Sequence, residues 1–220
     1  GEGVDHVDVG DQVMGIVVPF GAYREDKVLP GTSVVRVPTG VGMVAASTLP
    51  MNGITARRAL NLMSLRPGQM AKADGLFVVA DAAESDEKLV SELGADVVVR
   101  RGDDVAARIR DHFPDGVDGL VDASYQESLV LPAVKDGGVV TTIHDYRGDG
   151  RRGLRVLPAN AHELVGDGEA LPTLLRLKEL VEDGKVTLRV AGTFAAEDAA
   201  AAHRLLERGG VRGRLVLTFD

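Results

Sequence analysis

The spacing of hydrophobic and polar residues changes along the chain. The first fifty residues show short apolar runs separated by turn residues, at 11–18 and at 34–37, and the second run ends at Pro38. Residues 52–65 then carry apolar side chains at helical spacing and are followed by Pro67-Gly68. This pattern predicts two strands and then one helix that stops before the proline.

From residue 76 onward, apolar runs alternate with amphipathic segments. The run 76–80 is apolar throughout, which is typical of a strand buried on both faces. Further strands are predicted at 97–99, 119–122 and 139–143, with helices at 85–93, 105–112, 129–134 and 171–182. The tail is predicted as strand 186–190, helix 195–208 and strand 215–219. Such alternation predicts an α/β fold built on a doubly wound parallel sheet.

Composition narrows the class of protein. At 220 residues and 45% hydrophobic, the chain can bury a substantial core, and it has no apolar run of membrane-spanning length. The absence of cysteine excludes disulfides, cysteine-ligated zinc and thiol catalysis, and fits a reducing cytoplasm. The net charge of −8 and the scattered basic residues argue against nucleic-acid binding. We therefore expect a cytoplasmic protein without a signal peptide, membrane contact or metal.

Six phrases then occur in a fixed order along the chain. They are GEGVDHVDVGDQVMG at 1–15, GAYRE at 21–25, TLPMNGITA at 48–56, LGAD at 93–96, PDGVD at 114–118, and AAHR through GRLVL at 201–217. Together they resemble the zinc-independent quinone oxidoreductases, the zeta-crystallin-like branch of the medium-chain dehydrogenase/reductase superfamily. The resemblance runs from one end of the chain to the other, although no single phrase is diagnostic.

The resemblance implies two domains. A Rossmann-like cofactor domain would occupy 49–188, and 1–48 with 189–220 would form a GroES-like β-rich catalytic domain that lacks its N-terminal part. It also implies an NAD(P)H-dependent, metal-free reductase of a quinone, enone or similar activated carbonyl, acting as a homodimer on a small electrophile. Two alternatives stay open: an enoyl thioester reductase of polyketide type, and a non-catalytic scaffold that has lost cofactor binding.

The chain departs from this family after Gln69. A buried strand, a glycine-rich turn and a helix should follow, but residues 70–75 resemble the end of that helix, so roughly 20 residues are missing. We expect the chain to have no G-x-G-x-x-G turn for the cofactor phosphates. We also predict a break between Gln69 and Met70, and a second seam between Val18 and Gly21.

Candidate cofactor contacts follow from the resemblance and from the ends of the predicted strands. Asp81 would accept hydrogen bonds from the adenosine ribose and repel a 2′-phosphate, which favours NAD(H), unless it only caps a helix. Thr142, Ile143 and His144 follow a strand and would face the nicotinamide, and Asn52 and Thr55 would present polar groups to the same half of the cofactor. Helix capping is an equally good explanation for Asn52.

Two further residues end or follow a predicted strand. Asp122 is expected to cap the next turn, with a place beside the adenine as the weaker interpretation, and Tyr125 could line the crevice. No nucleophile–base–orienter set can be read from the sequence, as expected where a cofactor carries the chemistry.

Overall fold

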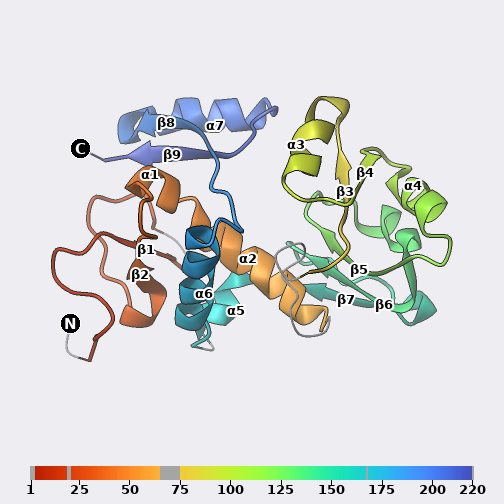
Figure 1. The fold of residues 1–220 in the computed structure, drawn as a ribbon, viewed down its shortest axis with the longest axis horizontal. Coiled ribbons are helices and arrows are strands. Elements are labelled where there is room, and N and C mark those ends of the chain that lie inside the picture. The colour runs from red at the N-terminus through yellow and green to blue at the C-terminus, as the bar shows by residue number, and fades with distance from the viewer. Residues whose placement is uncertain (1–2, 19–20, 65–74, 167, 220) are drawn as a thin grey trace. The chain divides into compact units, whose positions relative to one another are not determined.

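The computed structural model describes residues 3–18, 21–64, 75–166 and 168–219, and the chain forms two compact units. The first unit joins Gly1–Ile54 with Ala161–Asp220, and the second is Thr55–Asn160 (Figure 1). These boundaries differ from the predicted ones at 48/49 and 188/189, because residues 161–188 cluster with the first unit. The assignment of 49–188 to a cofactor domain stays a prediction.

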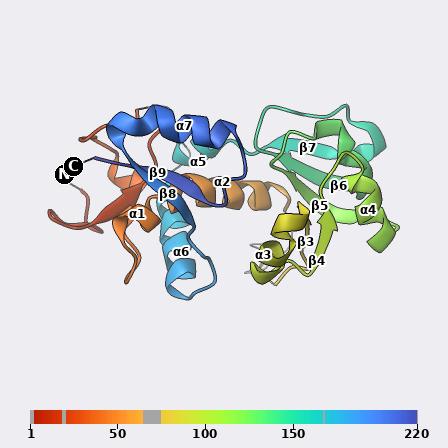
Figure 2. The same cartoon turned by 90° about the horizontal axis from the view of Figure 1, so that it is seen from above.

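The first unit contains two small sheets. Its strands are β1 (Val13–Gly15) and β2 (Val34–Arg36), which pair antiparallel, and β8 (Val190–Ala195) and β9 (Arg214–Thr218), which pair parallel. Its helices are α1 (Met43–Ala46), the start of α2 (Leu49–Leu62), α5 (Ala161–Gly166), α6 (Ala170–Glu182) and α7 (Ala199–Glu207). Helix α7 lies along β8 and β9 (Figure 2).

Helix α6 supplies the centre of this unit's core. Leu174, Leu177 and Leu180 recur every third residue, so they share one face, and that face is buried as the helix packs on β2. Leu177 also occupies the space beside Gly53 of α2, because a Cβ atom on Gly53 would lie 2.6 Å from the Leu177 Cδ1 atom. This packing places α6 in the first unit.

Glu182 connects the end of α6 to the turn after β2. Its Oε1 atom accepts hydrogen bonds from Lys178 Nζ at 2.7 Å and from the Thr39 backbone N–H at 2.8 Å. The Lys178 bond first, and then the Thr39 bonds, lower the pKa of Glu182 from 4.5 to about 2.

A lowered folded-state pKa means that the ionised carboxylate stabilises the fold above the unfolded-state pKa. That stability is lost as the pH falls from about 4.5 towards 2. We expect Glu182→Gln to cost about 1 kcal/mol at pH 7, because the site is partly exposed, and clearly less at pH 2, where about half of the carboxylate is protonated. Urea titrations at several pH values measure this, and a pH-independent difference would contradict it.

The second unit is built on parallel strands. They are β3 (Val79–Ala82) with β4 (Val97–Arg100), and β5 (Val117–Asp122) with β6 (Val134–Thr142) and β7 (Arg155–Pro158). Helices α3 (Glu87–Glu92) and α4 (Val105–His112) belong to the same unit. One core cluster joins α4 to β4 and includes Val99, Val105 and Ile109, and another lies around Val140 and Val156.

The parallel strands fall into two separate sheets. In a dinucleotide-binding fold the strand order is 3-2-1-4-5-6, so the first strand lies between the second and the fourth. If β3 to β7 correspond to strands two to six of that fold, the full order would be β4-β3, then strand one, then β5-β6-β7. The observed orders β3-β4 and β5-β6-β7 match this sheet without strand one. The described residues contain no strand that pairs with both β3 and β5. The predicted break at Gln69–Met70 and the seam at Val18–Gly21 both lie on residues outside the described part.

Three predicted elements differ clearly from the observed ones. The helix predicted at 129–134 was wrong: the chain forms two short 3-10 turns, Glu127–Leu129 and Leu131–Ala133, and β6 begins at Val134. Pro132 explains this, because proline lacks the N–H that a continuous helix needs and biases the residue before it away from helical geometry. The strand predicted at 186–190 begins only at Val190, where pairing with β9 starts.

The strand predicted at 76–80 also begins later than expected. Strand β3 starts at Val79, and Phe77 is exposed, with its ring edge against Phe113. Within the described residues β3 pairs with β4 alone, and the run is not buried as a central strand would be. No helix within the described ranges is both long and apolar enough to cross a membrane.

Candidate functional site

The best candidate site lies where β5 and β6 end. Asp122 is the last residue of β5 and Thr142 the last of β6, and the two are direct partners in the parallel ladder. In open α/β sheets, ligands bind outside the carboxyl ends of the strands. The residues that follow these two positions therefore form the candidate site.

Asp122 organises the turn after β5. Its side chain is 2% exposed and accepts hydrogen bonds from the backbone N–H groups of Glu127 (2.7 Å), Ser124 (3.0 Å) and Gln126 (3.3 Å). Burial alone would raise the pKa of Asp122, but these backbone N–H groups outweigh it and hold the pKa below its usual value. The predicted role of Asp122 as a turn cap is confirmed.

The capped turn holds two residues in a strained backbone conformation. Tyr125 has φ 59° and Glu127 has φ 52°, in the left-handed region that glycine accepts freely and other residues rarely adopt. Each such residue costs on the order of 1–2 kcal/mol. The three hydrogen bonds to the Asp122 carboxylate offset this cost and fix the direction of both side chains.

Tyr125 and His144 stack face to face. Their ring centroids are 4.1 Å apart, and the ring planes differ by 15°. His144 is largely buried, neither of its ring nitrogens has a hydrogen-bond partner, and Nε2 lies 3.5 Å from Glu127 Oε1. Tyr125 is 66% exposed. The pair therefore presents an aromatic surface at the ligand edge of the sheet, backed by an imidazole and a carboxylate.

Thr142 and Ile143 complete this edge. The Thr142 hydroxyl donates to the His144 carbonyl at 2.6 Å, so it shapes the chain's own turn. The Ile143 backbone N–H donates to the Asp122 carbonyl at 3.3 Å, and its side chain is exposed. The structure thus brings together the predicted residues 142–144 with Asp122 and Tyr125. Their contact with a cofactor stays a prediction.

Asp81 lies near the carboxyl end of β3 and is already paired. Arg101, just after β4, donates from Nε to Asp81 Oδ2 at 2.5 Å and also contacts the Asp81 carbonyl. Sequence reasoning missed this partner because the two residues meet only through the pairing of β3 with β4. The pairing weakens the charge that Asp81 would present to a ribose or a 2′-phosphate.

Asn52 and Thr55 lie one turn apart on α2. The helix begins at Leu49, so Asn52 lies inside the helix and is not its N-cap, which makes the capping interpretation wrong. Asn52 is exposed and Thr55 half-buried. Asn52 belongs to the first unit and Thr55 to the second, and their contact with the nicotinamide stays a prediction.

The phosphate end of a dinucleotide has no matching turn in the described residues. The expectation that the chain has no G-x-G-x-x-G spacing was wrong, because Gly148, Gly150 and Gly153 have it. This stretch, however, leads through a 3-10 turn into β7 and not into a helix. Its Arg152 side chain hydrogen-bonds Asp136 and the Val134 carbonyl, which places it at the amino end of β6, away from the ligand edge.

The residues present therefore fit a dinucleotide only in part. The contacts of Asp81 with its ribose and of residues 142–144 with its nicotinamide ring stay predictions. No glycine-rich turn opening a helix is found for the pyrophosphate within the described ranges. The same ranges contain no cluster of three or more potential metal ligands.

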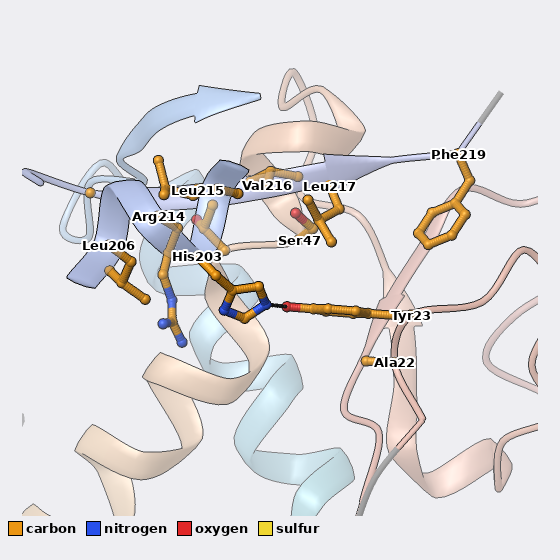
Figure 3. A pocket seen from close by; sticks show the side chains of 13 residues that line it. Ala22, Tyr23, Ser47, His203, Leu206, Arg214, Leu215, Val216, Leu217 and Phe219 are labelled. Atoms are coloured by element: carbon orange, nitrogen blue, oxygen red, sulfur yellow. Dashed lines mark hydrogen bonds between the residues drawn. The ribbon is translucent and has the colours of Figure 1, made fainter. Parts of the chain in front are cut away.

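The first unit holds a separate pocket of about 350 Å³ over β9 (Figure 3). At its mouth the Tyr23 hydroxyl and His203 Nε2 are hydrogen-bonded at 3.1 Å, and Arg214 lies nearby on β9. This hydrogen bond joins residue 23 to His203 on α7. Sequence reasoning missed the pocket because its walls lie about 180 residues apart in the chain.

A family model described as zinc-binding dehydrogenase matches residues 93–217, more than half of the chain. The chain belongs to this family, within the medium-chain dehydrogenase/reductase superfamily, which confirms the superfamily and the Rossmann-like α/β fold class predicted from the sequence. The quinone oxidoreductase branch stays a prediction.

Individual relatives vary in their described activities. An NAD-dependent alcohol dehydrogenase of Sulfolobus acidocaldarius is 28% identical over 90% of this chain and 64% of its own length. A probable quinone oxidoreductase of Schizosaccharomyces pombe is 22% identical over 95% and 73%. The crystal structure of CurK enoyl reductase superposes with a TM-score of 0.74 at 19% identity, over 86% of this chain and 66% of that one.

The chain spans about two thirds of these proteins. The alignment with the alcohol dehydrogenase runs over 222 residues, more than this chain's 220, so that relative has residues with no counterpart here.

Proposed function

We propose that the protein is an NAD(P)H-dependent oxidoreductase that reduces a quinone, enone or similar activated carbonyl. The observation that carries this is the ligand edge at β5 and β6, where Tyr125 and His144 form an aromatic surface held by a buried carboxylate. The nicotinamide supplies a hydride when bound. The chain's own residues orient a flat ligand against this surface and keep water from the buried side of His144.

Ligand-induced stabilisation tests the cofactor half of this proposal. A ligand that binds only the folded state, present at about 100 times its Kd, stabilises that state by about 2.7 kcal/mol. We expect NADH or NADPH to raise the melting temperature measured by differential scanning fluorimetry. No rise with either nucleotide would favour a non-catalytic scaffold. Within the described residues, the lack of a glycine-rich turn opening a helix and the separation of the parallel strands into two sheets support that alternative.

A turnover screen separates the substrate classes. With either nucleotide as reductant, we compare a quinone, a simple enone and an enoyl thioester. The thioester is included because the fold is similar to that of CurK enoyl reductase. Reduction of the thioester alone would replace the quinone proposal with the enoyl one.

The Asp81–Arg101 pair suggests how the enzyme would discriminate between NADH and NADPH. We expect Asp81→Asn to shift the preference towards NADPH by about tenfold, because it removes a negative charge and frees the Arg101 guanidinium for a 2′-phosphate. The ratio of kcat/KM for the two nucleotides measures this. Arg101→Gln is the matched control and should shift the ratio the other way, and movement of both variants in one direction would contradict this role for the pair.

We further propose a homodimer, as in the branch that the sequence resembles. Light scattering at micromolar concentration tests this, and a monomeric mass would contradict it.

A further inference from the structure

We infer that the pocket over β9 in the first unit binds an elongated monocarboxylate with an apolar tail, such as a medium-chain fatty acid. The carboxylate lies at Arg214 and His203, and the tail runs along β9 towards Phe219 (Figure 3). All residues of this site belong to the first unit, and the inference does not depend on the proposed reductase activity.

Arg214 supplies an uncompensated positive charge. It is the only fully charged residue among the described residues that line the pocket, although acidic residues outnumber basic ones in the chain by 33 to 25. Arg101 and Arg152 of the second unit each bond a carboxylate, whereas within the described ranges no oxygen pairs with the Arg214 guanidinium. Since a guanidinium holds a carboxylate through two parallel hydrogen bonds, a ligand carboxylate complements this charge.

His203 offers a second donor at the same end of the pocket. The Tyr23 hydroxyl and His203 Nε2 are hydrogen-bonded at 3.1 Å. When Tyr23 is the donor, Nε2 is the acceptor, so the proton of the neutral imidazole is on Nδ1. Figure 3 shows Nδ1 on the side of the ring that faces the Arg214 end of the pocket. A carboxylate there receives an N–H from α7 as well as the guanidinium of β9.

The rest of the pocket wall is apolar and incompletely covered. Leu206 on α7 is 57% exposed and Phe219 is 39% exposed. Leu215, Val216 and Leu217 of β9 are only half-buried. Exposed apolar surface that is gathered at one place, with a few polar groups at its end, is typical of a binding site for an amphipathic ligand.

The dimensions of the pocket favour a chain over a large ring system. Its volume of about 350 Å³ is near the lower end for ligand sites, which hold about 300–1,000 Å³. Arg214 and Phe219 are five residues apart along an extended segment, so they are separated by about 17 Å at ~3.3 Å per residue. A small volume that is drawn out over this length fits a thin chain with its anionic group at one end.

Direct titration tests the site. The full chain is titrated by isothermal calorimetry with octanoate and, separately, with octan-1-ol, which has the same tail without the charge. We expect Arg214→Gln to weaken octanoate binding about tenfold and Arg214→Lys, which keeps the charge, to weaken it less than about threefold. Octan-1-ol should bind the parent protein and Arg214→Gln equally well.

The apolar wall is tested in the same way. Leu206→Ser should weaken octanoate binding about fivefold, because the tail loses apolar contact area. Leu175→Ser is the matched control, since it changes another exposed leucine on a helix of the first unit, and it should have no effect. Arg155→Gln, at an exposed arginine of the second unit, controls for general charge attraction and should also have no effect.

Four outcomes would overturn the site. They are no octanoate binding by the parent protein, unchanged octanoate affinity in Arg214→Gln, equal weakening by Arg155→Gln, and binding of acetate as tightly as octanoate. The last result would mean that the cation attracts any small anion and that the apolar wall contributes nothing.

Discussion

Replacing Asp122 with alanine should lower the free energy of unfolding by about 3 kcal/mol. Three backbone N–H groups, those of Ser124, Gln126 and Glu127, would lose their buried acceptor, and each unsatisfied group costs about 1–3 kcal/mol before the turn relaxes. Urea unfolding followed by circular dichroism measures the loss. Asp122→Asn retains an acceptor oxygen without the charge, so we expect it to lose about half as much.

The pH dependence gives this prediction a second measurement. Since the folded-state pKa of Asp122 lies below the unfolded-state value of about 3.9, its carboxylate stabilises the fold above that value. That stability disappears as the pH falls through the folded-state pKa. The difference between the parent and the alanine variant should therefore be full at pH 7 and shrink below about pH 4. Equal stability at pH 7 would show that the turn does not depend on Asp122.

Leu177→Ala should cost about 3 kcal/mol, in the range of buried leucine truncations, because Leu177 is almost wholly buried between α6 and α2. Gly53→Ala alone should also destabilise the protein, since the added Cβ would clash with Leu177 at 2.6 Å. In the double variant the new methyl group fills part of the space that the leucine vacates.

The double variant should therefore lose less than the sum of the two single losses, by about 1 kcal/mol. Urea unfolding of the four proteins completes this cycle. Strict additivity would mean that Gly53 and Leu177 do not share the space that the structure shows.

Elements with a strong local pattern were predictable from the sequence. Helix α4 was predicted over the residues that it occupies, because its apolar side chains recur at helical spacing. Asp122 was predicted as a turn cap because an aspartate at the end of a strand accepts backbone N–H groups readily. Both predictions depend only on residues that are close together in the sequence.

Features that depend on distant contacts were not predictable in this way. The Tyr125–His144 stack forms only because the ends of β5 and β6 lie side by side in the sheet. The positive φ of Tyr125 cannot be predicted from the residue type. The Asp81–Arg101 pair depends on the register of β3 against β4. The G-x-G-x-x-G spacing at 148–153 was overlooked in the sequence, but the fold places it at the amino end of β6, away from the ligand edge.

The division into units sets an order of events during synthesis. The first unit is discontinuous, because Gly1–Ile54 and Ala161–Asp220 flank the whole of the second. On the ribosome, residues 55–160 are complete while β2 still lacks its partner α6. Translation runs at about 5–20 residues per second. The apolar surface of β2 that α6 later covers is therefore exposed for several seconds before α6 is synthesised. A chaperone that shields nascent chains would therefore act on the first unit rather than on the second.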